Sequence, residues 1–194
     1  ESIRQFLVHI KYLTNQATGL FCHGWTFEEN NHFGGALWGR GNAWYTAGLV
    51  DYMEITDIPK GVREFLLTTL LRQAEAFEKY QDADGMWHTL LNQPESSYAE
   101  ASATAGISYG LLKAARQGWI EPRYGYVAMK GVNAIEACID EDGILQRVSA
   151  GTCVGNTLDY YREIPISPQP YGQSMALLLL TEAARGDNKF LEEA

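Results

Sequence analysis

A short aromatic stretch of the chain carries one arginine among rings. The segment ALWGRGNAWYTAGL, residues 36–49, places Trp38 two residues before Arg40 and Trp44 four residues after it. Residues four apart share a helix face, so Arg40 and Trp44 are expected together, with Trp38 reaching the same space from the preceding loop. A guanidinium pairs with a carboxylate through two parallel hydrogen bonds, and indole faces stack on the C–H face of a sugar. These residues predict a receptor for a carboxylate on a sugar-like ring.

The loop that leads into this segment adds further polar and aromatic groups. Within FCHGWTFEENNHFGGALWGRGNAW, residues 21–44, the additional candidates are His23, Trp25, His32 and Asn42. The N-terminus of the following helix would also offer free N–H groups and a partial positive charge. A structural interpretation is equally open: the tryptophans anchor the loop on the core, and Arg40 pairs with Glu28 or Glu29.

Other chemistries have weaker support. Glu100 and Asp159 lie in expected loop regions and could act as an acid or base, although helix caps and structural carboxylates are commoner. His88 follows a turn as His23 does, and packing within a loop is the alternative role for both. GQSMA (172–176) lacks the G-x-S-x-G pattern, and SAGTCVGNT (149–157) has no lysine after it, so neither a serine nucleophile nor a phosphate loop is predicted. We expect no metal site and no cofactor.

Composition restricts the partners and the compartment. The formal net charge of −9 and the absence of a Lys/Arg cluster argue against nucleic-acid binding, and no apolar run is long enough to cross a membrane. Three widely spaced cysteines fit a reducing compartment, so a cytoplasmic location is expected. The chain starts at Glu1 inside ESIRQFLVHIKYL, which resembles the middle of a running helix. The true N-terminus is therefore expected to be missing.

Every long periodic stretch predicts a helix. Apolar residues recur at three- and four-residue steps in 60–81 and 123–139, and Pro59 and Pro122 suit the first turns of these helices. Helices rich in small and apolar residues are expected at 39–56, 99–118 and 170–186. No alternating pattern of useful length predicts a strand, so the chain is expected to be all-α.

The helices follow a repeat. ATGLF (17–21), DADGMW (82–87) and DEDGIL (140–145) each end a helix with a glycine suited to a positive φ, and their glycines are about 60 residues apart. Each unit predicts an outer helix, a long aromatic loop and a buried inner helix. Such units favour an (α/α)6 toroid with its loops gathered at one mouth. This chain, 1–194, would supply about three hairpins of a single domain, half a ring.

Four segments together carry a family resemblance: TGLFCHGWTF, ALWGRGNAWYTAGLVDYMEI, GMWHTLLNQPESSYAEASATAGISYGLLKAARQGWI and QPYGQSMALLLLTEAAR. In order and spacing, the chain resembles the unsaturated rhamnogalacturonyl hydrolases of glycoside hydrolase family 105, related to the unsaturated glucuronyl hydrolases of family 88. The resemblance implies an (α/α)6 toroid and a substrate left by polysaccharide lyases, a short pectin fragment ending in a 4,5-unsaturated uronic acid. The implied reaction protonates C4 of the vinyl ether, adds water at C5 and opens the resulting hemiketal.

The resemblance also assigns roles to individual residues. Arg40, Trp38 and Trp44 would form the carboxylate clamp and stacking wall, and His23 would line the same pocket. The family's essential aspartates match no residue of this chain, so the catalytic acid/base is expected upstream of Glu1, in an N-terminal half that would complete the ring. The isolated chain is then expected to be inactive.

Two rival hypotheses remain at the level of sequence. One is a related toroid enzyme, another uronyl hydrolase or a sugar epimerase, that uses Asp159 or Glu100 as its acid/base. The other is a helical-repeat binding module without catalysis, whose aromatic loops hold a ligand or partner.

Overall fold

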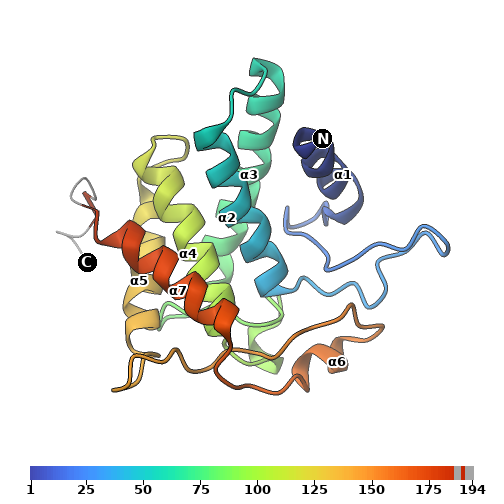
Figure 1. Ribbon diagram of the computed structural model, residues 1–194. Coiled ribbons are helices and arrows are strands. Elements are labelled where there is room, and N and C mark those ends of the chain that lie inside the picture. Colours follow the sequence, from blue (N-terminus) through green and yellow to red (C-terminus); the bar gives the residue numbers. More distant parts are fainter. Residues whose placement is uncertain (186–188, 191–194) are drawn as a thin grey trace.

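The computed structural model describes residues 1–185 and 189–190, and in these residues the chain is helical with only isolated β-bridges between loops. Figure 1 shows the order of the elements. The helices are α1 (Ser2–Leu13), α2 (Gly39–Ile55), α3 (Lys60–Tyr80), the 3-10 turn η1 (Pro94–Ser96), α4 (Ala101–Arg116), α5 (Arg123–Glu136), α6 (Leu158–Arg162) and α7 (Pro170–Ala183). The five long helices expected from periodicity are confirmed, with ends that differ by up to three residues. Position 186, the expected end of the last one, lies outside the described residues.

Helix α4 lies at the centre and packs against α2, α5 and α7. Every residue from 101 to 115 is buried, as expected for an inner helix with many small residues. Those small residues allow close approach: a Cβ added at Gly106 would lie 2.9 Å from Ala43 Cβ, and one at Gly110 would lie 2.5 Å from Thr46 Cγ2. The composition of this segment therefore sets how closely α2 and α4 approach.

The outer helices bury one face only. In α3 the buried positions include Leu66, Leu70, Ala74 and Phe77, three or four residues apart, and the remaining positions are largely exposed. Pro59 and Pro122 each occupy the position directly before the first helical residue, rather than lying inside the first turn as expected. Both positions leave the missing proline N–H without consequence, since the first N–H groups of a helix have no partner in it.

The three repeated turns have the backbone conformation that the sequence predicts. Gly19, Gly85 and Gly143 have φ values of +79°, +86° and +77°. At Gly85 a side chain would also collide with the backbone carbonyl of Lys130 on α5, so glycine is required there twice over.

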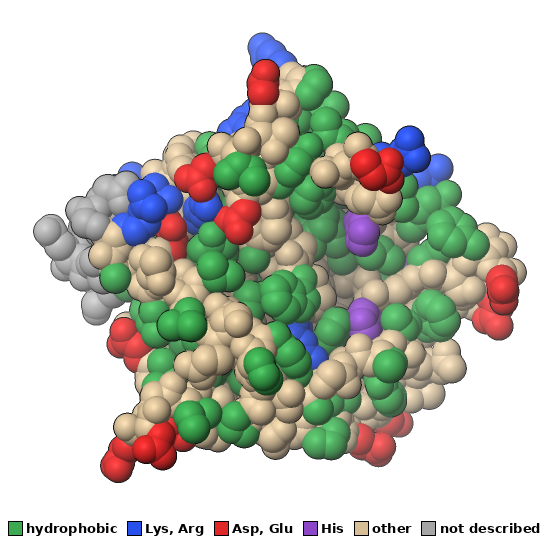
Figure 2. Space-filling model, viewed as in Figure 1, with side chains coloured by type: hydrophobic (Ala, Val, Ile, Leu, Met, Phe, Trp, Pro, Cys, Tyr) green, Lys and Arg blue, Asp and Glu red, His purple; other side chains and the backbone are tan. Residues whose placement is uncertain are grey.

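The loops that follow these turns gather at one end of the helices, below α2, α4 and α7 in Figure 1. An isolated bridge joins Trp38 to Leu90, and Gly34 N donates to Gly155 O at 3.0 Å, so loops far apart in the sequence lie side by side. The expectation that the aromatic loops share one end is confirmed. Figure 2, in the same view as Figure 1, shows a hollow above these loops, with histidine and hydrophobic side chains around it.

Helices α2 and α7 are among those that present large apolar side chains to solvent. On α2 the side chains of Trp44 and Ile55 are 46% and 80% exposed, and on α7 those of Leu177 and Leu178 are 59% and 42% exposed. Helix α2 otherwise buries most of its residues against α4 and the loops. The two helices that carry these exposed side chains both pack against α4.

Candidate functional site

The first turn of α2 fixes the loop that carries His23. Asn42 is 1% exposed, its Oδ1 accepts a hydrogen bond from Phe21 N at 2.8 Å, and its Nδ2 donates to Phe21 O at 2.9 Å. Two residues later, His23 N donates to Ala36 O at 2.9 Å. The side-chain amide of Asn42 therefore replaces a strand partner for this turn, and the turn places His23 beside the residues that precede α2.

His23 is half-buried against aromatic rings. The centroid of its ring lies 4.0 Å from that of Trp38, and Nδ1 lies 2.8 Å from Tyr161 Oη. Burial, and secondly the positive charge of Arg40, lower the pKa of His23 to about 4. The imidazole is therefore neutral at neutral pH, and it can offer a hydrogen bond but carries no charge.

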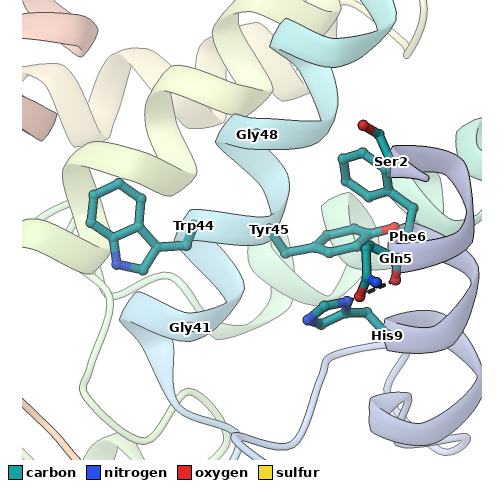
Figure 3. Close-up of a pocket in the computed structure, with 8 residues that line it drawn as sticks. All are labelled: Ser2, Gln5, Phe6, His9, Gly41, Trp44, Tyr45 and Gly48. Carbon is teal, nitrogen blue, oxygen red and sulfur yellow. Dashed lines mark hydrogen bonds between the residues drawn. The ribbon is translucent and has the colours of Figure 1, made fainter.

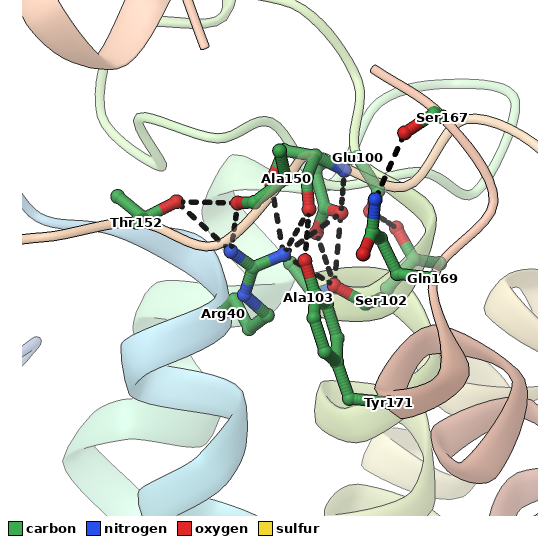
Figure 4. A network of polar contacts seen from close by, with 11 residues as sticks. Arg40, Glu100, Ser102, Ala103, Ala150, Thr152, Ser167, Gln169 and Tyr171 are labelled. Carbon is green, nitrogen blue, oxygen red and sulfur yellow. Dashed lines mark hydrogen bonds and ion pairs between the residues drawn. The ribbon is translucent and has the colours of Figure 1, made fainter. Parts of the chain in front are cut away.

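Arg40 is a buried guanidinium, 3% exposed, at the second position of α2. Nη1 donates to Ser149 O at 2.6 Å and to Ser149 Oγ at 3.0 Å, and Nη2 donates to Ala150 O at 2.8 Å and to Thr152 Oγ1 at 2.9 Å. Figure 4 shows this network. All of these acceptors are neutral oxygens, so the hydrogen bonds hold the charge in place without neutralising it.

Two rings enclose the same guanidinium. The Arg40 carbon Cζ lies 4.9 Å from the centre of the Trp38 ring and 4.6 Å from that of Tyr171. Both distances are within the range of a cation–π contact. The structure therefore places an arginine among aromatic rings, as the sequence suggested, with Tyr171 as the second ring.

The carboxylate nearest Arg40 is Glu100, whose Oε1 lies 3.8 Å from Nη1. Glu28 and Glu29, the partners considered in the structural interpretation, are exposed in the loop. Glu100 is 1% exposed and caps α4: it accepts hydrogen bonds from Ala103 N at 2.6 Å, Ser149 N at 2.8 Å and the hydroxyl of Ser102. These hydrogen bonds make Glu100 the N-cap of α4.

Asp159 and His88 have partners of their own. Asp159 lies at the surface, with its side chain 78% exposed and ion-paired with Arg162 at 2.5 Å. His88 Nε2 lies 2.5 Å from Asp82 Oδ2, and its Nδ1 lies 2.6 Å from Ser97 O. Both nitrogens of His88 are thus engaged within its loop.

Trp44 lies apart from this cluster. Arg40 bends beyond the end of α2 toward the carbonyls of the 149–152 segment, and no cation–π contact joins it to Trp44 in the described part of the chain. Trp44 instead borders a cavity of about 450 Å³ between α1 and α2, with Ser2, Gln5, Phe6, His9, Gly41, Tyr45 and Gly48. Figure 3 shows Tyr45 directed toward α1 and Trp44 leaving α2 on the other side.

Three contributors were missed by sequence reasoning. Tyr171 donates to Ser149 O at 2.5 Å and is the second residue of α7, as Arg40 is of α2, so the helical repeat itself could have identified it. Thr152 belongs to a segment without regular structure, and Tyr161 to a five-residue helix that is too short for any periodic signal.

The described residues contain no group of three His, Cys, Asp or Glu side chains that could hold a metal ion. In the same part of the chain, no helix is long and apolar enough to cross a membrane.

The fold and this site define a class. The chain superposes with a TM-score of 0.91 and 45% identity on a possible member of glycoside hydrolase family 105 from Salmonella enterica, covering 93% of this chain and 48% of that one. It also shares the fold of the unsaturated glucuronyl hydrolase from Bacillus sp. GL1, at 22% identity and a TM-score of 0.70, over 94% of this chain and 51% of that one. The chain thus has the helical architecture of the (α/α)6 glycoside hydrolases.

Sequence comparison identifies the family within that class. The model of Glycosyl Hydrolase Family 88 matches residues 1–186, and the chain belongs to that family. It is 32% identical over 186 residues to the unsaturated rhamnogalacturonyl hydrolase YesR of Bacillus subtilis, covering 95% of this chain and 52% of that protein. The chain therefore spans about half the length of this relative. The resemblance inferred from the motifs is confirmed.

Proposed function

We propose that this chain is part of an unsaturated uronyl hydrolase and that it supplies contacts to the terminal unsaturated uronic acid. The observation that carries the proposal is the joint placement of His23, Trp38 and Arg40, in which a neutral imidazole and a charged guanidinium both contact one indole. The name of the Bacillus subtilis relative supports a rhamnogalacturonyl substrate, such as a lyase-generated pectin fragment.

The proposed reaction is a hydration. An acid protonates C4 of the unsaturated ring, water adds at C5, and the hemiketal opens to release the next sugar. Such chemistry needs a carboxyl group to donate the proton and activate the water. Glu100 is enclosed by its three donors and Asp159 lies at the surface, so neither is our candidate. We assign this role to an aspartate in a segment preceding Glu1.

Arg40 supplies the positive charge for the uronate carboxylate. Its inner nitrogen Nη1 is enclosed by Ser149, whereas the contacts of Nη2 with Ala150 O and Thr152 Oγ1 are only partly buried. Residues 151–155 have no regular secondary structure. We therefore place the carboxylate at Nη2, where it exchanges with the hydroxyl of Thr152. A charged acceptor forms a stronger bond with a guanidinium than a neutral one does, which favours this exchange.

Trp44 would contact the substrate from a different direction. Its ring is 46% exposed one helical turn beyond Arg40, so a ligand that extends from Arg40 along α2 can stack on it. The exposed apolar side chains of α2 and α7 fit burial against the helices of an N-terminal half, the partner that would complete the ring.

The test follows the double bond. The protein containing this chain and its N-terminal half, given unsaturated rhamnogalacturonan or oligogalacturonide fragments, should reduce the ultraviolet absorbance of the conjugated double bond. The 194-residue chain alone should not. If the isolated chain reduces the absorbance, the catalytic acid/base must be a carboxylate within these 194 residues. If the complete protein does not reduce the absorbance of any unsaturated uronide, the proposal is overturned.

The Arg40→Lys variant tests the carboxylate contact. It retains the charge but lacks the planar fork, and kcat/KM should fall on the order of a hundredfold, about 3 kcal/mol. Thr152→Val is the matched variant, because it replaces with a methyl group only the hydroxyl that the carboxylate displaces, and we expect it to keep kcat/KM or raise it. Because Arg40 is buried, both variants must first show a cooperative unfolding transition.

A further inference from the structure

Tyr161 is a fully buried side chain beside the candidate site, 1% exposed on the short helix α6. It packs in a small cluster with Trp38 and Leu90, apart from the main core. Two contacts hold the helix in place. The hydroxyl of Thr157 caps its N-terminus, and Arg162, its last residue, donates from Nε to Ser96 O at 3.0 Å. A five-residue helix anchored in this way fixes the position of one phenol.

The hydroxyl of Tyr161 has two partners among the described residues. Gly155 N donates to Oη at 3.0 Å, and His23 Nδ1 lies 2.8 Å away. The backbone N–H can only donate, so Oη accepts that bond. The phenolic proton is then left with one acceptor in the described part of the chain, the Nδ1 lone pair of His23.

The proton balance selects one tautomer of the neutral imidazole. If Nδ1 carried the proton, Oη could accept from both Nδ1–H and Gly155 N–H, but the buried phenolic proton would then have no acceptor among the described residues. If Nε2 carries the proton, Gly155 N–H, the phenol O–H and Nδ1 form one continuous chain of donors and acceptors. Leaving a buried donor unpaired is costly, so the second arrangement should dominate by at least about tenfold.

We propose that Tyr161 is a positioning residue that holds His23 in the Nε2–H tautomer, so that the imidazole presents a hydrogen-bond donor to an oxygen of the ligand. Nε2 has no hydrogen-bond partner in the described residues, and the His23 side chain is half-buried, so this edge is free to meet a ligand. The identity of the ligand rests on the proposed function, in which His23 contacts the terminal unsaturated uronic acid.

The low pKa of His23 agrees with this arrangement. Burial, followed by Arg40, disfavours the imidazolium. A hydrogen bond donated by the Tyr161 hydroxyl to Nδ1 also stabilises the neutral ring. The Nε2–H donor therefore persists throughout the neutral pH range.

Nitrogen NMR of the histidine rings tests the proposal without substrate. Long-range proton–nitrogen spectra of the 194-residue chain, with His23 assigned by loss of its signals in His23→Gln, should show a protonated Nε2 and an unprotonated, hydrogen-bonded Nδ1. In Tyr161→Phe, Nδ1 should shift to the value of a free imidazole nitrogen, and the pKa of His23 should rise by on the order of one pH unit. Tyr160→Phe is the matched control, since its hydroxyl only accepts from Cys153 N at 3.2 Å, and it should leave His23 unchanged.

The outcomes separate clearly. A protonated Nδ1 in the unmodified chain would overturn the proposal, and so would a Tyr161→Phe spectrum identical to the original. If Tyr161→Phe does not fold, the tautomer in the unmodified chain still decides the matter. Failure of the proposed function appears instead as absence of turnover in the complete protein, whatever the tautomer of His23.

Discussion

Replacing Glu100 by glutamine is the sharpest test of how the site is held together. The side chain keeps its shape, but one carboxylate oxygen becomes an NH₂ group. Oε1 accepts from Ser149 N at 2.8 Å and Oε2 accepts from Ala103 N at 2.6 Å, so either orientation of the amide sets two N–H donors against each other. The substitution also removes the negative charge 3.8 Å from Arg40.

The cost can be worked out from these contacts. A lost N-cap bond costs about 1 kcal/mol, and a buried N–H left without an acceptor costs about 1–3 kcal/mol. The attraction of unit charges at this distance is about 4 kcal/mol at an effective dielectric constant of 20, most of which desolvation of the pair offsets. We expect Glu100→Gln to lower the free energy of unfolding by about 3 kcal/mol, a large part of the 5–15 kcal/mol typical of a domain.

Urea unfolding measures this loss. The midpoint should fall while the slope of free energy against urea stays constant, because the surface exposed on unfolding does not change. Glu28→Gln removes the same charge from an exposed loop position and should change stability by less than about 0.5 kcal/mol.

Combining Glu100→Gln with Arg40→Met completes a double-mutant cycle, in which we expect a coupling energy above about 1 kcal/mol. A stability loss below about 1 kcal/mol for Glu100→Gln would refute the assignment of this carboxylate as a cap. It would also reopen Glu100 as a candidate acid/base.

Two further predictions concern pH and packing. The pKa of His23 is lowered from 6.5 to about 4, so the unfolded chain binds more protons between these values, and the stability present above pH 6.5 is lost as the pH falls toward 4. For this half-buried group the loss is on the order of 1–2 kcal/mol, and His23→Gln should flatten the pH dependence of the urea midpoint correspondingly. Gly131→Ala should destabilise by about 1–3 kcal/mol, because its Cβ would collide with Ser108 on α4, whereas Gly61→Ala, in open space on α3, should stabilise by about 0.5–1 kcal/mol in the same assay. Equal effects of the two glycine variants would show that α4 and α5 can separate without cost.

The fold was predictable where the sequence is periodic or needs glycine. Apolar spacing in 60–81 predicted α3 to within a residue of its end, and the positive φ of Gly85 followed from its place in a repeated turn. Helix α6 was not predicted, because five residues hold little more than one turn and it owes its position to anchors from other loops, such as the bond from Arg162 to Ser96 O.

The site was predictable in its residue types but not in its contacts. Trp38 and Arg40 do meet, as their spacing suggested, and His23 joins them through the turn held by Asn42. The acceptors of Arg40 within 3.0 Å lie more than a hundred residues away along the chain, at positions 149–152, and no local pattern predicts such a pairing. Helical spacing alone predicted that Trp44 would lie with Arg40. In the structure the guanidinium of Arg40 instead extends past the N-terminus of α2, because it donates hydrogen bonds to the carbonyls of Ser149 and Ala150.

One guanidinium therefore connects four parts of the molecule. Arg40 begins on α2, lies 3.8 Å from the cap of α4, donates to the 149–152 segment and stacks on Tyr171 of α7. Its hydrogen-bond acceptors are uncharged, and its carboxylate neighbour is already shared with Ala103 N and Ser149 N. The packing of three inner helices and the positive charge available to a ligand thus depend on the same side chain. Variants of Arg40 will consequently change stability and binding together. Thr152, in the segment without regular structure, and Tyr161, on the short helix α6, contact the site from outside the inner helices and allow the two to be measured apart.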